Sequence, residues 1–413
     1  MEFALFALTL LGVAVFHRWT FAVALSGMAA ITIWKLAVTG FKTGAGFPGL
    51  GHHIADEWVV LANLFLLLLG FALLAGHFAK SGIPDVMPAF LPDDWRGAFL
   101  LLALVFVLSS FLDNIAAALI GGTIATKIFK GRVHIGYVAG IVAAANAGGC
   151  FSVVGDTTTT MMWIDGVSPM SVADAFVAAV VALCVCGIPA ALQQQRYQPI
   201  VRDAVPGTHV DWTRVAIVLA ILGAAIAANV WAKLSAPWLL DVAPVIGLGV
   251  WVAILATSRV RRPDWDVLPA NLKGTVFLLA LVTCASMMPV ERLPAASWPV
   301  ALGLGFVSAV FDNIPLTALA LKQGGYDWGM LAYAVGFGGS MLWFGSSAGV
   351  AICSLFPESR DAVRWLLGGW HVVLAYIAGF AVMLALLGWH PDPPHKRVTA
   401  SDPATTTTAP ARR

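Results

Sequence analysis

SAVFDNIPLTALAL occupies residues 308–321 and places an aspartate, an asparagine and a proline at the centre of an otherwise apolar segment. A second stretch, SSFLDNIAAALIGG at residues 109–122, puts Asp113 and Asn114 in the setting that Asp312 and Asn313 have in the first. A charged side chain at the centre of a bilayer costs roughly 2.5–3.5 kcal/mol on insertion scales, so it usually faces a cavity or a partner. The paired Asp-Asn motifs therefore indicate two related functional positions.

Composition places the chain in a membrane. Of 413 residues, 59% are hydrophobic and 11% are charged, whereas a soluble domain carries about 25% charged residues. Apolar runs long enough for transmembrane helices recur along the whole length. No basic patch is interleaved with aromatic residues, which argues against nucleic acid as a partner. We expect a multi-pass protein of the cell inner membrane.

Eight runs read as straight spans, all of them apolar and free of central charges. They lie near residues 3–16, 21–38, 58–79, 169–190, 213–231, 237–256, 272–290 and 365–389. The first run has Glu2 before it and Arg18 after it, which is the reverse of a cleavable signal peptide.

The two Asp-Asn stretches fit re-entrant hairpins better than straight spans. Residues 98–129 are too long for one span, and each arm of about 15 residues reaches only about 22 Å of a hydrocarbon layer about 30 Å thick. We therefore predict hairpins over residues 98–129 and 299–321, with Asp113 and Asp312 at their tips.

Each predicted hairpin is followed by a glycine-interrupted segment. Residues 135–164 contain ANAGG and then GDTTTTMMWI, and residues 328–356 contain GFGGSMLWFGSSAGVA. Both predict a half-helix, an unwound piece and a second half-helix. Unwound backbone exposes carbonyl oxygens, and helix ends carry partial charge, so such breaks can coordinate a small ion.

The order of span, hairpin and broken helix occurs twice, which predicts an all-α fold of two inverted five-span repeats. The repeats would cover residues 1–190 and 212–389, with a cytoplasmic linker over 191–211 and a disordered tail over 390–413. If each hairpin enters and leaves the membrane on the same side, most Lys and Arg residues lie on one side of the membrane. The positive-inside rule identifies that side as cytoplasmic. Both termini would then lie outside. This is the architecture of a secondary transporter.

The polar residues at the breaks narrow the substrate. Asp113, Asp156 and Asp312 are carboxylates, and no Lys or Arg accompanies them. Carboxylate, hydroxyl and carbonyl oxygens are hard ligands that suit Na⁺ or Li⁺, and carboxylates also take protons. Because burial favours the protonated form and a nearby cation the ionised form, cation and proton would compete for one site.

Together, FLDN, ANAGG, GDTTTTMMWI, DNIPL and GGSMLWFGSSAGVA resemble the NhaD-type sodium/proton antiporters, a branch of the ion transporter superfamily. The resemblance covers most of residues 58–389. It implies two inverted repeats, a scaffold domain, a mobile transport domain and a homodimer. Its implied activity is exchange of Na⁺ or Li⁺ for H⁺ by alternating access.

Carried over motif by motif, the resemblance implies an ion and proton site at the hairpin tips and helix breaks. The candidate ligands are Asp113, Asn114, Asp156, Thr157, Thr158, Asp312, Asn313, Thr317, Ser346 and Ser347. Among them, Asp113, Asp156 and Asp312 are the expected Na⁺ or Li⁺ carboxylates. We expect no cofactor.

Two rival functions stay open. One is transport of oxyanions or dicarboxylates by the same fold, although dicarboxylate relatives carry neutral residues at the hairpin tips. The other is a membrane-embedded enzyme. No His-Glu-x-x-His or Gly-x-Ser-x-Gly pattern is present, so we expect no enzymatic activity.

Several polar and thiol groups are expected to be peripheral. His52, His53, Asp56 and Glu57 are predicted to form a solvated external loop, with the gathering of protons or of a metal as the alternative. His371 is expected to be a packed, hydrogen-bonded histidine, with a proton relay or a pH sensor as the alternative. All five cysteines lie in apolar segments and are expected to be buried and inert.

Overall fold

The computed structural model describes residues 1–16, 19–42, 44–86, 91–201, 209–353 and 355–392. These residues form helices and connecting turns, and no named strand occurs among them. The all-α prediction is therefore confirmed. The tail predicted over residues 390–413 lies almost entirely outside the described residues.

The helices up to residue 201 include one long helix, α3, and several short ones. They are α1 (Glu2–Val15), α2 (Thr20–Trp34) continuing as a π-turn (Lys35–Thr39), α3 (Gly46–Ala79), α4 (Ile83–Val86), α5 (Trp95–Ser109), α6 (Asn114–Ile128), α7 (Ile135–Gly149), α8 (Thr157–Ile164), α9 (Pro169–Ala173) and α10 (Ala175–Tyr197).

The later helices repeat the mixture of long and short elements. They are α11 (Trp212–Ser235), α12 (Leu239–Val242), α13 (Val245–Thr257), α14 (Leu268–Ser286), α15 (Trp298–Ser308), α16 (Asn313–Gln323), α17 (Trp328–Gly338), α18 (Ser347–Ile352), α19 (Ala362–Gly368) and α20 (Trp370–Leu387), with short 3₁₀ turns at Trp265–Val267, Val290–Arg292 and Pro357–Ser359.

Six helices of the described chain are long and apolar enough to cross a membrane. They begin near residues 20, 46, 169, 212, 265 and 370. The multi-pass prediction is confirmed at this level. Two other predicted spans form shorter apolar helices: residues 3–16 form α1, and residues 237–256 divide into α12 and α13.

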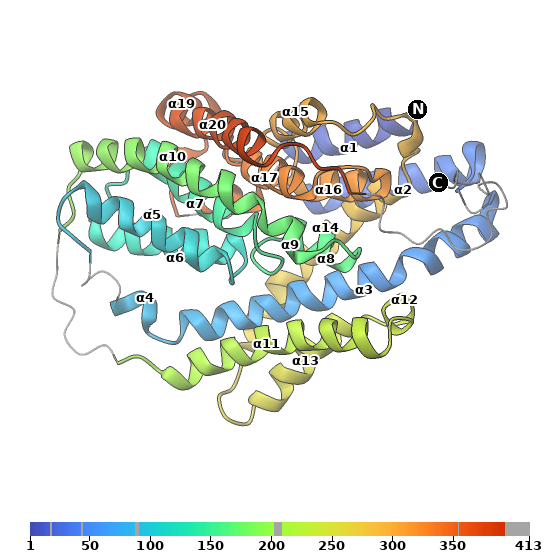
Figure 1. Cartoon of the computed structure of the whole chain (residues 1–413), viewed down its shortest axis with the longest axis horizontal. Coiled ribbons are helices and arrows are strands. Elements are labelled where there is room, and N and C mark those ends of the chain that lie inside the picture. Colours follow the sequence, from blue (N-terminus) through green and yellow to red (C-terminus); the bar gives the residue numbers. More distant parts are fainter. Residues whose placement is uncertain (17–18, 43, 87–90, 202–208, 354, 393–413) are drawn as a thin grey trace, which may run out of the picture.

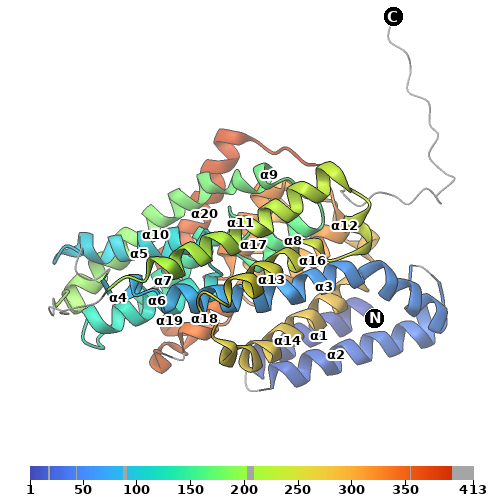
Figure 2. The same ribbon diagram turned by 90° about the horizontal axis from the view of Figure 1, so that it is seen from below.

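The helices form two packed groups. The long α3 lies beside α11, α13 and α14, and α14 also packs against α2 (Figure 1 and Figure 2). In the other group α10 packs against α5, α7 and α20, and α17 packs against α15 and α20. The two groups meet where α14 contacts α16 and where α3 contacts α8.

The chain is interrupted between two successive helices at each Asp-Asn motif. The arms α5 and α6 pack together around the break before Asn114, and α15 and α16 contact each other around the break before Asn313. The backbone angles φ and ψ are −53° and 140° at Asp113 and −52° and 139° at Asp312. The two motifs therefore bend the chain in the same way, at the positions that the sequence predicts.

The two glycine-interrupted segments also match. Asp156 precedes α8 with φ −144° and ψ 145°, and Ser346 precedes α18 with φ −142° and ψ 153°. A Cβ atom added to Gly155 would overlap the carbonyl oxygen of Ser109, and one added to Gly345 would overlap that of Ala309. Glycine therefore lets each unwound piece lie directly against the preceding pair of arms.

Short helices from the first part of the sequence pack against short helices from the second part. Helix α8 packs against α16, and α18 packs against α6. The half-helix after each glycine-rich break therefore contacts the helix that follows the Asp-Asn motif of the other part. These two contacts bring the polar residues at the ends of the four short helices into one region.

One prediction about the chain before Trp58 was wrong. His52, His53, Asp56 and Glu57 lie within α3, which begins at Gly46, and not in a loop. His53 is buried, its Nε2 lies 3.1 Å from Ser286 Oγ, and its ring stacks on Phe41. These long-range contacts continue the helix through polar residues that would otherwise favour a solvated loop.

Two further predictions need correction. Cys184 is exposed on α10, while the other four cysteines are buried as predicted. Residues 365–389 do not form one uninterrupted helix, because α19 ends at Gly368 and α20 begins at Trp370.

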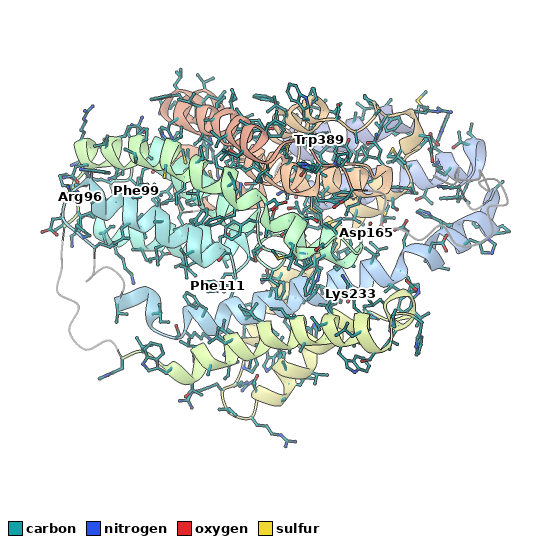
Figure 3. The ribbon with its side chains drawn as sticks, viewed as in Figure 1. Arg96, Phe99, Phe111, Asp165, Lys233 and Trp389 are labelled. Atoms are coloured by element: carbon teal, nitrogen blue, oxygen red, sulfur yellow. The ribbon has the colours of Figure 1, made fainter. Side chains whose placement is uncertain are left out.

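Charged residues lie at several helix ends. Arg96 lies at the left end of the molecule in Figure 3. Where α3 ends, Lys80 Nζ lies 2.6 Å from Asp264 Oδ2, and Arg261 Nε lies 2.9 Å from Asp211 Oδ2. These ion pairs tie the end of α3 and the start of α11 to the turn after α13.

Candidate functional site

Asp156 lies at the centre of the polar region, at the start of α8. Its Oδ1 accepts a hydrogen bond of 3.0 Å from Asn114 Nδ2, and its Oδ2 lies 3.4 Å from Asn313 Nδ2. Thr158 Oγ1 also donates to Oδ2. Asp156 is only 3% exposed. One carboxylate therefore contacts the amides that follow both Asp-Asn breaks.

A second set of bonds joins the same region to the other broken helix. Asn114 Nδ2 donates to Asn146 Oδ1 at 3.1 Å. Asn146 Nδ2 in turn donates to Ser340 Oγ at 2.9 Å and to Ser346 Oγ at 3.1 Å. The chain of bonds from Asp156 through Asn114 and Asn146 thus ends at the start of α18.

Asp312 has its own partners. Its Oδ1 accepts from the backbone N–H of Ile314 at 3.0 Å, which caps α16. Its Oδ2 accepts from Ser347 Oγ at 3.1 Å. Asp312 is therefore bonded to the start of α18 as well as to its own helix.

A cavity of about 340 Å³ opens beside Asp156. Six of its lining residues were predicted as ligands: Asp113, Asn114, Asp156, Thr157, Asn313 and Ser347. Its apolar wall comes from α3, between Leu64 and Ala79, and from α14. The cavity therefore extends from the polar centre toward the end of α3, where Lys80 and Asp264 pair.

A second cavity of about 230 Å³ lies next to the first. Asp312 lines this second cavity, together with Thr20 and apolar residues of α1, α14 and α18. Ile115 and Ser347 line both cavities. The two spaces therefore adjoin at these residues, and Asp312 lines only the second.

The structure thus divides the predicted carboxylates. Asp113 and Asp156 share the first cavity, and Asp312 lines the second. Within the described residues, no group of three or more His, Cys, Asp or Glu side chains is placed to hold a metal ion together. The participation of all three carboxylates in one cation site stays a prediction.

The remaining predicted residues lie behind the cavity walls. Thr158 is fully buried and bonds to Asp156, and Thr317 is fully buried and donates to the carbonyl of Asn313. Ser346 accepts from the N–H of Gly349 and so caps α18. These groups hold the cavity-lining residues in place.

Asn146 and Ser340 were not predicted as site residues. Both are fully buried, and both belong to motifs that mark the helix breaks: Asn146 to ANAGG and Ser340 to GGSMLW. A polar side chain next to a paired glycine inside an apolar helix was the available signal. His371 is also buried, with its Nε2 3.3 Å from Gln193 Oε1.

No protein-family model matches the chain. The chain is 29% identical over 408 residues to sodium/proton antiporter 1 of Arabidopsis thaliana, which covers 88% of this chain and 68% of that protein. It is 27% identical over 397 residues to the Na⁺/H⁺ antiporter NhaD of Vibrio parahaemolyticus, covering 79% and 90%. The NhaD of Halomonas elongata is 25% identical over 421 residues, covering 87% and 82%. These matches, which extend over most of the chain, confirm its resemblance to the NhaD-type sodium/proton antiporter family.

Proposed function

We propose that this membrane protein exchanges Na⁺, or Li⁺, for H⁺ at a site centred on Asp156. The observation that carries the proposal is the position of this carboxylate, which accepts hydrogen bonds from Asn114, Asn313 and Thr158. The similarity to sodium/proton antiporters over most of the chain supports the same exchange.

Proton binding would alter this arrangement directly. An ionised carboxylate only accepts hydrogen bonds, whereas a protonated one also donates one. A proton on Oδ1 would face the donor of Asn114, and a proton on Oδ2 would face the donors of Asn313 and Thr158. Because Oδ2 already accepts two bonds, a proton on Oδ2 would compete with Asn313 and Thr158 for its lone pairs.

Cation binding has the ligands that it needs in the first cavity. Asp113, Asp156, Thr157 and the side-chain oxygen of Asn114 are hard oxygen donors, which suit Na⁺ and Li⁺. A cation beside Asp156 would favour the ionised carboxylate that both amides contact. Cation and proton therefore exclude each other at one position, which is the coupling that exchange requires.

The alternative is transport of an oxyanion or a dicarboxylate. An anionic substrate is stabilised by neutral hydrogen-bond donors, helix N-termini or a cationic side chain, and is repelled by carboxylates. Among the described residues, no Lys, Arg or His lines either cavity. The carboxylates that do line them favour a cation.

We further propose that the protein consists of two inverted repeats with re-entrant hairpins. The matched backbone angles at Asp113 and Asp312, and at Asp156 and Ser346, support the repeat. The arms α5, α6, α15 and α16 have at most 15 residues each, about 22 Å, which is short for a full crossing. Alternating access would follow from motion of one helix group against the other.

The proposed topology places both termini outside the inner membrane and residues 191–211 in the cytoplasm. The first cavity would then open toward the cytoplasm, because it extends to the end of α3 near Lys80. A homodimer, which the family resemblance implies, completes the proposal.

The exchange activity can be tested directly in proteoliposomes. With a pH-sensitive dye inside the vesicles and no imposed voltage, external NaCl or LiCl should trigger an internal pH change, while choline chloride should not. Addition of a dicarboxylate or an oxyanion as a choline salt tests the rival function. A pH change with the anion alone, and none with Na⁺ or Li⁺, would replace antiport by anion transport.

The topology makes a separate prediction. In a variant without natural cysteines, we expect an impermeant thiol reagent to label Lys322→Cys in intact cells and Lys130→Cys only after the membrane is opened. Lys233→Cys, at the proposed outer end of α11, serves as the matched control for outside labelling. Equal labelling of positions 130 and 322 in intact cells would refute the inverted arrangement.

A further inference from the structure

Asn146 joins parts of the chain that lie far apart in sequence. It is fully buried in α7, it accepts from Asn114, and it donates to Ser340 and Ser346. Asn114 lines the first cavity, whereas Asn146 lies behind it. Asn146 therefore contacts a predicted ligand without reaching the cavity itself.

The negative charge of Asp156 determines which group donates and which accepts in these hydrogen bonds. Because ionised Asp156 can only accept hydrogen bonds, Asn114 must turn its Nδ2 group toward it. The other hydrogen of Nδ2 goes to Asn146 Oδ1. One donor of Asn114 thus goes to the cavity-lining Asp156 and the other to Asn146 behind the wall, which leaves its Oδ1 free to accept or to coordinate.

The orientation of Asn146 is fixed by residues of the second broken helix. Because its Oδ1 accepts from Asn114, its Nδ2 is left to donate to the two serine hydroxyls. Ser346 caps α18 and Ser340 follows the break after α17. The orientation of one cavity amide thus depends on residues of the second broken helix.

The matching position in the second broken helix differs. Asn146 lies three residues before Gly149, and Gly336 lies three residues before Gly339. A Cβ atom on Gly336 would lie 3.6 Å from Asp156 Oδ2. The first broken helix therefore has an amide, Asn146, next to Asn114. The second broken helix has Gly336 at the matching position, near Asp156, and so has no side chain there.

We propose that Asn146 is a positioning residue that holds Asn114 with its Oδ1 toward the transported cation. This inference rests on the proposed exchange function. It predicts that Asn146 sets cation affinity and the preference between Na⁺ and Li⁺, because a rotating Asn114 would present hydrogen atoms to the cation in part of the population.

The test compares Asn146→Ala with Ser308→Ala in the dye assay. Ser308 is also fully buried and donates to the carbonyl of Val335 at 2.7 Å, so its removal deletes a buried bond at a helix break outside this chain of bonds. We expect Asn146→Ala to raise the KM for Na⁺ about tenfold, as for loss of one buried hydrogen bond, with maximal rate within about twofold. The KM ratio of Na⁺ to Li⁺ should change as well, while Ser308→Ala should keep both values.

A binding measurement shows whether Asn146 acts through Asn114. In purified protein, Na⁺ should raise the melting temperature, and the Kd follows from the concentration dependence. If Asn146 works by orienting Asn114, adding Asn146→Ala to Asn114→Ala should change the Kd by less than about twofold. Ser346→Ala, which removes one acceptor of Asn146, should give a smaller rise in Kd and serves if Asn146→Ala does not fold.

The failures of the two proposals can be told apart. A wild-type protein that moves no protons with Na⁺ or Li⁺ would refute the exchange function. A wild type that exchanges, with Asn146→Ala and Ser346→Ala both matching Ser308→Ala in KM and ion ratio, would refute the role of Asn146 alone. Additive effects of Asn146→Ala and Asn114→Ala on the Kd would also contradict it.

Discussion

Replacing Asp156 by Asn should reduce Na⁺/H⁺ exchange by at least about a hundredfold, while the protein still inserts and folds. The change keeps the shape of the side chain but removes the charge and one acceptor for three donors. Loss of a charge-assisted hydrogen bond costs about 1.5–3 kcal/mol, and about 2.7 kcal/mol corresponds to a hundredfold in rate. The measurement is the initial rate of Na⁺-driven pH change in proteoliposomes.

The matched control is Asp241→Asn. Asp241 is exposed in α12 and lines neither cavity, so the same substitution there should leave the rate unchanged. Equal expression and equal elution from a sizing column establish that both variants fold. Normal exchange by folded Asp156→Asn would remove Asp156 from the mechanism and leave Asp113 and Asp312 as carriers.

The apparent affinity for Na⁺ should weaken as pH falls. If Na⁺ and H⁺ compete at one carboxylate, each tenfold rise in proton concentration below its pKa raises the KM for Na⁺ by up to about tenfold per competing proton. The maximal rate should change little, because saturating Na⁺ displaces the proton. The measurement is KM for Na⁺ and for Li⁺ across a pH series, in proteoliposomes without a membrane voltage.

Two comparisons make this pH series decisive. Asp241→Asn should show the wild-type slope, and Li⁺ should give the same slope as Na⁺ with a different absolute KM. A KM that does not vary with pH across the active range contradicts competition and indicates a separate proton path or a symporter.

The sequence predicts the breaks of the fold accurately because the signals are local. An aspartate within an apolar run is costly unless it has a partner, and paired glycines permit close backbone approach. These rules place the ends of α5, α7, α15 and α17 and the starts of α6, α8, α16 and α18 within a few residues. Asp113, Asp156 and Asp312 each precede a helix, as their motifs predict.

The errors arise where distant contacts decide. The polar residues from His52 to Glu57 read as a loop, but His53 bonds to Ser286, 233 positions away, and the helix continues through them. Asn146 has partners from two other segments, including Ser340 at a separation of 194 positions. No local pattern specifies such pairs.

The assignment of the three carboxylates to one ligand set rests on the motifs and stays a prediction. The similarity of the two Asp-Asn motifs predicts equivalent roles for Asp113 and Asp312, and their backbone angles are indeed nearly the same. Their surroundings differ, because Asp113 shares a cavity with Asp156 whereas Asp312 bonds to Ser347 and lines another cavity. The difference comes from the packing of α18 and α14, which the motifs do not encode.

In the proposed mechanism, one carboxylate site centred on Asp156 holds either a cation or a proton. Its most direct test is proton release from purified protein in weakly buffered detergent solution, followed with a pH dye as NaCl is added. We expect Na⁺ and Li⁺ to release protons from the wild type and from Asp241→Asn, choline chloride to release none, and Asp156→Asn to release none. Na⁺ binding by the wild type without proton release, or unchanged release from folded Asp156→Asn, would contradict this mechanism.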